Sequence, residues 1–330
     1  MVDVVVIGAG VIGSSIALEL ARAGRRVLVL DRAPGAGQGS TSASSAIVRY
    51  NFSTAAGVAM AWEAHFGWQD WAGHLGHDVG DLAKFRRCGL VMLDVEAAPR
   101  PSWLPLFDEI GVPYEEWDSA ELAKRVPGID TGRYWPPKRL EDAEFWEDAS
   151  STLGGVYTPD AGYVSDPALA AVNLAAAAAA EGAEFGFRST VTAVEKSGGH
   201  VDAVRLADGT FFGCGVVVNA AGPWSGTVNR LAGVGSEFTV NVRPLRQEVA
   251  HVPVPAGYRG PAVADMDLGT YFRGEVGGDL LVGGTEPECD PLQWVDDPDS
   301  VDVHPTAAVF EAQVARRLPD FRCVEPGARL

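Results

Sequence analysis

The chain has 330 residues, of which 47% are hydrophobic and 21% charged, and its formal net charge is −18 at pH 7. This length is enough for two domains with sizeable cores, and the composition is that of an ordinary soluble globular protein. The acidic balance argues against nucleic acid and anionic membrane surfaces as partners, because both would be repelled.

Targeting and metal-binding signals are weak. No secretory signal precedes the first expected strand, and no apolar run is long enough to span a membrane. His74 and His77 lack a third ligand at a suitable spacing, so no metal site is predicted. No CxxC pair occurs among the four cysteines, which are Cys88, Cys214, Cys289 and Cys323. These features predict a cytoplasmic protein with reduced thiols.

The most informative motif lies at the N-terminus. An apolar strand at Val4–Ile7 leads into Gly8-x-Gly10-x-x-Gly13, then into a helix and a second strand that ends before Asp31. Gly8 allows a tight turn, Gly10 lets the backbone approach a pyrophosphate, and Gly13 lets the helix pack on the strand. The helix N-terminus offers free N–H groups and a positive dipole end to the phosphates.

The acid that ends the second strand extends this motif. Asp31 follows Gly8 by 23 residues, near where a ribose-binding carboxylate belongs. An acid at this place argues against a 2′-phosphate and therefore against NADP. A tight turn without a ligand is the alternative, but strand, helix, strand and acid together favour a dinucleotide site.

Further along the chain, a Ser-rich loop is followed by a helix predicted over Thr54–Leu75, and then by a strand at Gly89–Leu93. The segment Tyr134–Ser151 is rich in Trp, Pro and acids and predicts an exposed loop or insertion. The apolar stripe of the predicted helix consists of Val58, Trp62, Phe66 and Trp71.

Regular structure returns after residue 160. Asp166 and Pro167 predict the start of a helix and Gly182 its end, and Asp208-Gly209 predicts a hairpin turn. The other predicted elements are strands at Thr190–Glu195, Val201–Leu206, Val216–Asn219, Arg246–Val252, Gly269–Arg273 and Leu280–Gly283, and a helix at Pro305–Leu318.

This order of elements predicts an α/β fold in which a Rossmann-like dinucleotide-binding domain is interleaved with an α+β substrate domain built on an antiparallel sheet. We assign 1–85 and 152–235 to the first domain, 86–151 and 236–310 to the second, and 311–330 to a helix that returns to the first. Ligands in such folds lie between the domains, at the carboxyl ends of the parallel strands.

NAD and FAD both use this glycine motif, so other segments must discriminate between them. They are Gly39–Ser45 (GSTSASS), for which a solvated loop is the alternative, Gly162–Pro167 (GYVSDP) and Val216–Ser225 (VVVNAAGPWS). With the glycine motif, these segments resemble the D-amino-acid oxidase superfamily of FAD-dependent oxidoreductases, and most of all its sarcosine, dimethylglycine and glycine oxidase-like branch. The resemblance runs from Val2 to about Asp290.

The resemblance implies FAD as the cofactor, with its pyrophosphate at Gly8, Gly10 and Gly13 and its adenosine ribose at Asp31. The FAD is expected to be non-covalent, because no His or Cys matches the flavin-linking positions. The other cofactor contacts that the resemblance implies are Val11, Ile12, Arg32, Ser40, Thr41, Ser44, Val191, Ala220, Ala221, Gly222 and Trp224.

Three residues are candidates for the substrate side. Arg49 matches an arginine that binds the substrate carboxylate in amine-oxidising relatives, and a guanidinium fork suits a carboxylate. A structural ion pair is the alternative for Arg49. Tyr271 and Arg273 would face the flavin and clamp or cover a small acid, although Arg273 could instead face solvent.

The resemblance implies that a small anionic amino acid or N-methyl amine transfers a hydride to flavin N5. The strand within Gly278–Gly283 lacks the lysine that promotes reaction with oxygen in sarcosine oxidases. A dehydrogenase with an unidentified electron acceptor is therefore favoured over an oxidase. Family members continue further, so we expect a fragment, a partner chain that supplies the missing flavin-binding segment, or an incomplete flavin site.

Three alternatives remain open. One is a flavoenzyme of the same superfamily that oxidises 2-hydroxy acids, since an arginine clamp suits any small anion. Another is an NAD-dependent dehydrogenase, which would have one continuous nucleotide domain. The last is a non-catalytic or incomplete flavin-binding subunit, in which no amine or hydroxy acid would reduce the flavin.

Overall fold

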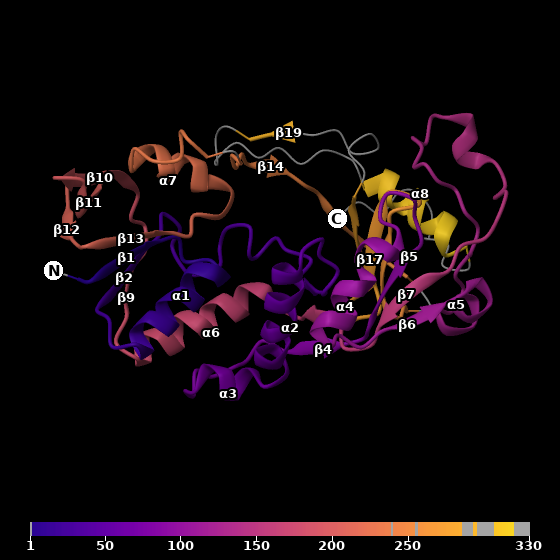
Figure 1. Ribbon diagram of the computed structural model, residues 1–330, viewed down its shortest axis with the longest axis horizontal. Helices are drawn as coiled ribbons and strands as arrows, with labels where there is room; N and C mark the ends of the chain where they lie inside the picture. The colour runs from indigo at the N-terminus through magenta and orange to yellow at the C-terminus, as the bar shows by residue number, and fades with distance from the viewer. Residues whose placement is uncertain (1, 239, 255–256, 286–292, 296–306, 320–330) are drawn as a thin grey trace.

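The computed structural model describes residues 2–238, 240–254, 257–285, 293–295 and 307–319. A four-stranded parallel sheet lies at one end of the molecule, and a seven-stranded, mostly antiparallel sheet lies at the other (Figure 1). Each sheet is assembled from segments distant in sequence, which interleaves the two parts of the fold.

The parallel sheet has the order β13 (Val216–Asn219), β1 (Val4–Ile7), β2 (Val27–Leu30) and β9 (Glu184–Gly186). Strands β1 and β2 are apolar and buried throughout, as expected for strands covered on both faces. Alternate residues of these strands pack against α1 (Val11–Arg22) and α6 (Pro167–Ala180). The others pack against the sheet of β10 (Val191–Ser197), β11 (His200–Leu206) and β12 (Phe211–Gly213).

The seven-stranded sheet is covered on one face by α2 (Ala55–Gln69) and α4 (Leu104–Ile110), and on the other by α5 (Ser119–Arg125) and α8 (Ala307–Arg317). Its strands, in order, are β15 (Val249–Val252), β18 (Leu280–Gly284), β17 (Thr270–Gly274), β16 (Ala262–Asp265), β5 (Leu90–Leu93), β7 (Gly155–Thr158) and β6 (Glu115–Trp117).

A small antiparallel sheet of β3 (Ile47–Val48), β8 (Gly162–Val164) and β4 (Phe85–Arg87) follows the Ser-rich loop. The remaining elements are α3 (Trp71–Leu75), α7 (Ser225–Leu231), β14 (Leu245–Arg246), β19 (Gln293–Trp294) and the 3-10 helices η1 (Arg100–Ser102), η2 (Ala143–Trp146) and η3 (Gly222–Trp224).

The predicted fold class is confirmed, and so are the start of α6, where Asp166 accepts a hydrogen bond from Leu169 N, and its end near Gly182. The single helix predicted over Thr54–Leu75 is wrong. Asp70 ends α2 and caps α3 by accepting a hydrogen bond from Gly73 N, so the chain turns there. Phe66 is 55% exposed and does not belong to a buried stripe.

The strand predicted over Arg246–Val252 is also divided, because β14 pairs with β19 whereas β15 pairs with β18. The last helix ends at Arg317, close to its predicted end, while Pro305 and 320–330 lie outside the described residues. The predicted domain boundaries stay predictions. None of the helices in the described ranges combines the length and apolar character of a bilayer-spanning segment.

Candidate functional site

The turn between β1 and α1 contains the three predicted glycines, and two of them are required by the protein's own backbone. A Cβ at Gly8 would lie 2.3 Å from the carbonyl oxygen of Ala220, and a Cβ at Gly13 would lie 1.8 Å from the carbonyl oxygen of Gly8. A Cβ at Gly10 would lie 3.1 Å from Thr41 Oγ1, and apart from the adjacent backbone no other atom of the described chain would lie within 4 Å of it. Gly10 is therefore the glycine with space for a ligand beside it.

Side chains from two loops bind backbone amides at this turn. Asp31, directly after β2, accepts hydrogen bonds from Ala9 N at 2.6 Å and Ala33 N at 2.8 Å. Thr41 Oγ1 accepts one from Val11 N at 3.1 Å. The Ser-rich loop thus folds back onto the glycine turn, as a shared diphosphate site requires. Ile12, in the first turn of α1, is 64% exposed.

The segment after β13 lies beside the same turn. The Asn219 side chain accepts a hydrogen bond from Ala221 N at 3.2 Å, and its Nδ2 donates to two oxygens of α7. Gly222 has a φ of 55°, and no atom of the described chain lies within 4 Å of where its Cβ would be. The Arg32 guanidinium lies 5.7 Å from the Trp224 ring centroid. The carboxyl ends of β1, β2 and β13 therefore meet at one place.

Three predicted cofactor contacts are less closely associated with the turn. Ser40 is exposed, and Ser44 Oγ accepts a hydrogen bond from Ala46 N at 3.0 Å. Val191 begins β10 and packs against the apolar cluster beneath the parallel sheet. Their roles toward a cofactor stay predictions.

Arg49 follows β3, and its side chain contacts the segment directly after it. Its Nη1 donates to the backbone oxygen of Asn51, and its guanidinium lies 4.7 Å from the ring centroid of Phe52. Within the described chain no carboxylate comes within 4.0 Å of it, so the ion-pair alternative is not observed there. Desolvation by the surrounding protein lowers the pKa of Arg49, with no charged neighbour contributing. Arg49 is nevertheless exposed to solvent, so its guanidinium is an accessible cation that is suited to an anionic ligand.

Asn51 was not singled out by its sequence. Both polar atoms of its carboxamide are buried, and neither has a hydrogen-bond partner in the part of the chain that the structure describes. A buried amide without partners is costly, and such groups are normally satisfied. The place of Asn51, two residues after Arg49, is the only sequence signal that could have drawn attention to it.

The backbone next to Arg49 is anchored by a buried pair. Tyr50 is fully buried, and its hydroxyl donates to the carbonyl oxygen of Asp160 at 2.9 Å and lies 2.6 Å from His65 Nδ1. Because a carbonyl oxygen can only accept, His65 Nδ1–H is the donor to Tyr50. The Trp62 ring stacks on the His65 ring, with centroids 4.9 Å apart.

This pair predicts a pH dependence of stability. Desolvation lowers the pKa of His65 below its ordinary 6.5, so the unfolded chain takes up a proton before the folded chain does. Stability is therefore lost as the pH falls below 6.5, by up to about 1.4 kcal/mol per pH unit. In urea unfolding from pH 7.5 to 5.5, His65→Gln should reduce this slope. Equal slopes for wild type and His65→Gln would contradict the prediction.

Tyr271 and Arg273 lie on the same face of β17. The Tyr271 ring packs over Gly283 of β18, where an added Cβ would lie 2.4 Å from it. Arg273 is only 3% exposed, so the solvent-facing alternative is wrong. Its Nε donates to the Ser45 carbonyl oxygen at 2.7 Å, and its Nη1 pairs with Glu275 at 2.8 Å. The predicted contacts of both residues with substrate stay predictions.

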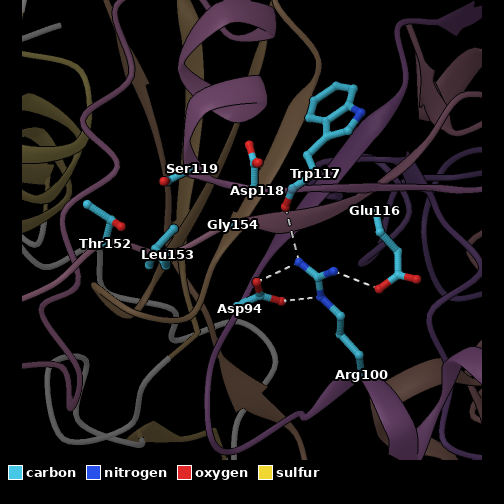
Figure 2. Close-up of a pocket in the computed structure, with 9 residues that line it drawn as sticks. All are labelled: Asp94, Arg100, Glu116, Trp117, Asp118, Ser119, Thr152, Leu153 and Gly154. Carbon is cyan, nitrogen blue, oxygen red and sulfur yellow. Dashed lines mark hydrogen bonds and ion pairs between the residues drawn. The ribbon is translucent and has the colours of Figure 1, made fainter.

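A pocket of about 480 Å³ lies elsewhere, beside β6 and β7. Figure 2 shows that Arg100 is surrounded there by acceptors: it binds Asp94 through two nitrogens, at 2.7 and 2.6 Å, and Glu116 at 2.7 Å. None of the predicted site residues lines this pocket. The candidate site at the glycine turn and Arg49 is therefore separate from this pocket. No group of three or more metal-binding side chains occurs among the described residues.

The chain is similar to a known family and to several known proteins. The sequence profile of the family described as DAO, FAD dependent oxidoreductase, matches residues 3–328. The chain is 27% identical over 292 residues to glycine oxidase of Geobacillus kaustophilus, covering 86% of this chain and 70% of that one. It is 34% identical over 125 residues to mouse FAD-dependent oxidoreductase domain-containing protein 1, covering 34% of this chain but only 24% of the mouse protein.

The same fold occurs in a solved structure. L-Proline dehydrogenase from P. horikoshii superimposes with a TM-score of 0.77 at 22% identity, covering 97% of this chain and 77% of that chain. At this level of identity the likeness concerns the fold alone.

Proposed function

We propose that this chain, which belongs to the FAD dependent oxidoreductase family matched over residues 3–328, oxidises a small amino acid or N-methyl amino acid at the carbon next to the amine nitrogen. Membership of this family confirms the prediction that FAD is the cofactor, and it argues against an NAD-dependent dehydrogenase. When bound, FAD supplies the hydride acceptor. The chain's own residues then have to hold FAD, fix the substrate and exclude water.

The residues at the glycine turn suit the diphosphate and ribose of FAD. Gly10 leaves space beside the backbone, and Asp31 and Thr41 converge on the same turn. Asp31 retains acceptor capacity for ribose hydroxyls, because each of its oxygens accepts one described hydrogen bond and has a second lone pair.

The single observation that carries the substrate proposal is the solvent-accessible guanidinium of Arg49, which has no acidic partner among the described residues. A substrate carboxylate would accept two parallel hydrogen bonds from it and compensate its charge. The unpartnered carboxamide of Asn51 supplies a further donor and acceptor nearby. Similarity to glycine oxidase supports an amine as the donor, rather than a hydroxy acid.

We infer that the chain is a dehydrogenase rather than an oxidase. Strand β18, where sarcosine oxidases carry the oxygen-promoting lysine, consists here of buried apolar residues from Leu280 to Val282 followed by glycines. The electron acceptor would then be another molecule. Rapid reoxidation of the reduced flavin by air would contradict this inference.

Anaerobic mixing of the FAD-loaded protein with glycine, proline, sarcosine and 2-hydroxy acids tests the function. We expect amino or N-methyl amino acids to bleach the flavin absorbance. Arg49→Lys should weaken their binding about 10- to 100-fold, because a point charge does not replace a planar fork. Arg86→Lys, an exposed arginine on β4, is the matched control and should bind substrate normally.

Two outcomes would contradict the proposal. Reduction by hydroxy acids alone would assign the chain to the hydroxy-acid branch, and unchanged affinity in Arg49→Lys would remove Arg49 from the site. A flavin that none of these compounds reduces would instead favour the non-catalytic subunit.

A further inference from the structure

Arg273 joins the large antiparallel sheet to the loop that leads to Arg49. Its strand, β17, belongs to the seven-stranded sheet, whereas its Nε binds the carbonyl oxygen of Ser45 in the Ser-rich loop at 2.7 Å. The flat face of its guanidinium lies 4.1 Å from the ring centroid of Tyr163 on β8. Its Nη1 is fixed by Glu275 at 2.8 Å. One buried side chain therefore contacts two segments outside its own sheet.

These two segments are the ones that present Arg49. Ser45 is followed by Ala46, which has a φ of 51°, a left-handed conformation that costs energy in a residue with a Cβ. Ile47 is next, and its register partner across the β3–β8 pair is Tyr163. Arg49 comes directly after β3. Arg273 thus contacts the residue that leads into β3 and the Tyr163 ring on β8.

A planar guanidinium is suited to this place. It can donate in its plane to a carbonyl oxygen and a carboxylate while its face stacks on an aromatic ring. Those contacts occupy Nε, Nη1 and one face of Arg273. They restrain the loop at the point where the left-handed Ala46 would otherwise favour relaxation of the backbone.

We propose that Arg273 is a positioning residue, which sets the place of Arg49 for the substrate carboxylate and does not bind the substrate itself. The proposal rests on the proposed function, because it requires Arg49 to bind a carboxylate. It replaces the clamp predicted for Arg273 with an indirect role.

A double-mutant cycle between Arg49 and Arg273 tests the proposal. The variants are Arg273→Gln, Arg49→Lys and the double variant, and the probes are sodium acetate, followed by the change in flavin absorbance, and sarcosine in anaerobic reduction. We expect Arg273→Gln to weaken acetate and sarcosine binding at least 10-fold when Arg49 is present. In the Arg49→Lys background the same change should cost less than 3-fold, because a flexible ammonium depends little on loop geometry. FAD affinity should change less than 3-fold.

Two controls separate this role from general destabilisation. Arg100→Gln removes an arginine of similar pairing at the far edge of the same sheet (Figure 2) and should leave acetate binding unchanged. Glu275→Gln keeps the contacts of Arg273 with Ser45 and Tyr163 and should weaken acetate binding less than 3-fold. If Arg273→Gln does not fold, Arg273→Lys replaces it in the cycle, with an expected loss of 3- to 10-fold.

The outcomes distinguish the two hypotheses. Arg273→Gln could reduce acetate affinity equally in the wild-type and Arg49→Lys backgrounds. That result would mean direct binding by Arg273 or a general effect on the fold, and would overturn the positioning role. Normal acetate binding by Arg273→Gln would overturn it as well. Normal acetate binding by Arg49→Lys would instead contradict the proposed function itself.

Discussion

We expect Arg317→Met to lower the free energy of unfolding by about 3–5 kcal/mol, because it breaks a fully buried ion-pair network. Arg317 ends α8, and its side chain has no exposure to solvent. All five of its N–H donors are used. Nε and Nη2 bind Asp265, Nη2 also binds Asp267, and Nη1 donates to the carbonyl oxygens of Asp130 and Gly132.

The same network fixes the start of the Trp-rich segment. The carboxylate of Asp267 accepts hydrogen bonds from the backbone amides of Tyr134 and Trp135, both at 2.8 Å. The backbone oxygen of Arg317 accepts a further one from Asp130 N at 2.8 Å. Removal of the guanidinium would therefore leave two buried carboxylates without their counter-ion and weaken the connection between the three segments.

Urea unfolding of the FAD-free protein measures this loss. Arg125→Met is the matched control, since Arg125 also ends a helix and pairs with an acid, Glu121, but is half exposed. Its loss should cost less than about 1 kcal/mol. A cost below about 1 kcal/mol for Arg317→Met as well would show that the buried network contributes no more than a surface pair.

The stability deficit of Arg317→Met should also depend on pH. Burial already raises the pKa of Asp267, against the opposing effect of Arg317. Without the arginine, the folded-state pKa of Asp267 would rise further above that of the unfolded chain. A raised carboxyl pKa favours the folded state at low pH and disfavours it as the pH rises. The deficit should therefore be largest near pH 7 and narrow toward pH 4.

The parts of the fold that the sequence could predict are local ones. Hydrophobic runs, glycines and caps fix β1, α1, β2 and α6 within a few residues, because each signal acts within one element. The break at Asp70 was missed because apolar residues continue across it, and only the cap geometry reveals it. Composition alone likewise described Tyr134–Ser151 as an exposed loop, whereas its first amides are held by Asp267.

The candidate site divides in the same way. The glycine turn and Asp31 belong to one sequence motif and could be predicted from it. Arg49 could be predicted only from the resemblance to a known family. The interaction partner of each arginine side chain could not be predicted from the sequence. Among the residues that the structure describes, no acid lies beside Arg49, whereas Arg273 and Arg317 are held by Glu275 and Asp265 respectively. These differences arise from long-range packing, which residue type and spacing do not report.

The largest expected effect on the cofactor site comes from a pair of glycine substitutions with opposite consequences. In Gly13→Ala the new Cβ would lie 1.8 Å from the carbonyl oxygen of Gly8, so α1 has to move away from the turn. We expect a loss of stability at or above the upper end of the ~1–3 kcal/mol typical of overpacking. In Gly10→Ala the new Cβ would lie 3.1 Å from Thr41 Oγ1, a side-chain atom that has to shift by only a few tenths of an ångström, so the fold should be retained.

FAD binding should separate these two variants. Gly10→Ala fills the space through which a diphosphate approaches the backbone, and we expect its Kd for FAD to rise at least 10-fold, about 1.4 kcal/mol, while the Tm of the FAD-free protein changes little. Gly13→Ala should lower that Tm first and bind FAD weakly as a consequence. Gly24→Ala, at a glycine with a φ of 74° outside the turn, shows what backbone strain alone does to the Tm and to FAD affinity. Wild-type affinity in Gly10→Ala would show that the diphosphate does not pass this residue, because a methyl group there could not be avoided by a ligand that contacts the backbone.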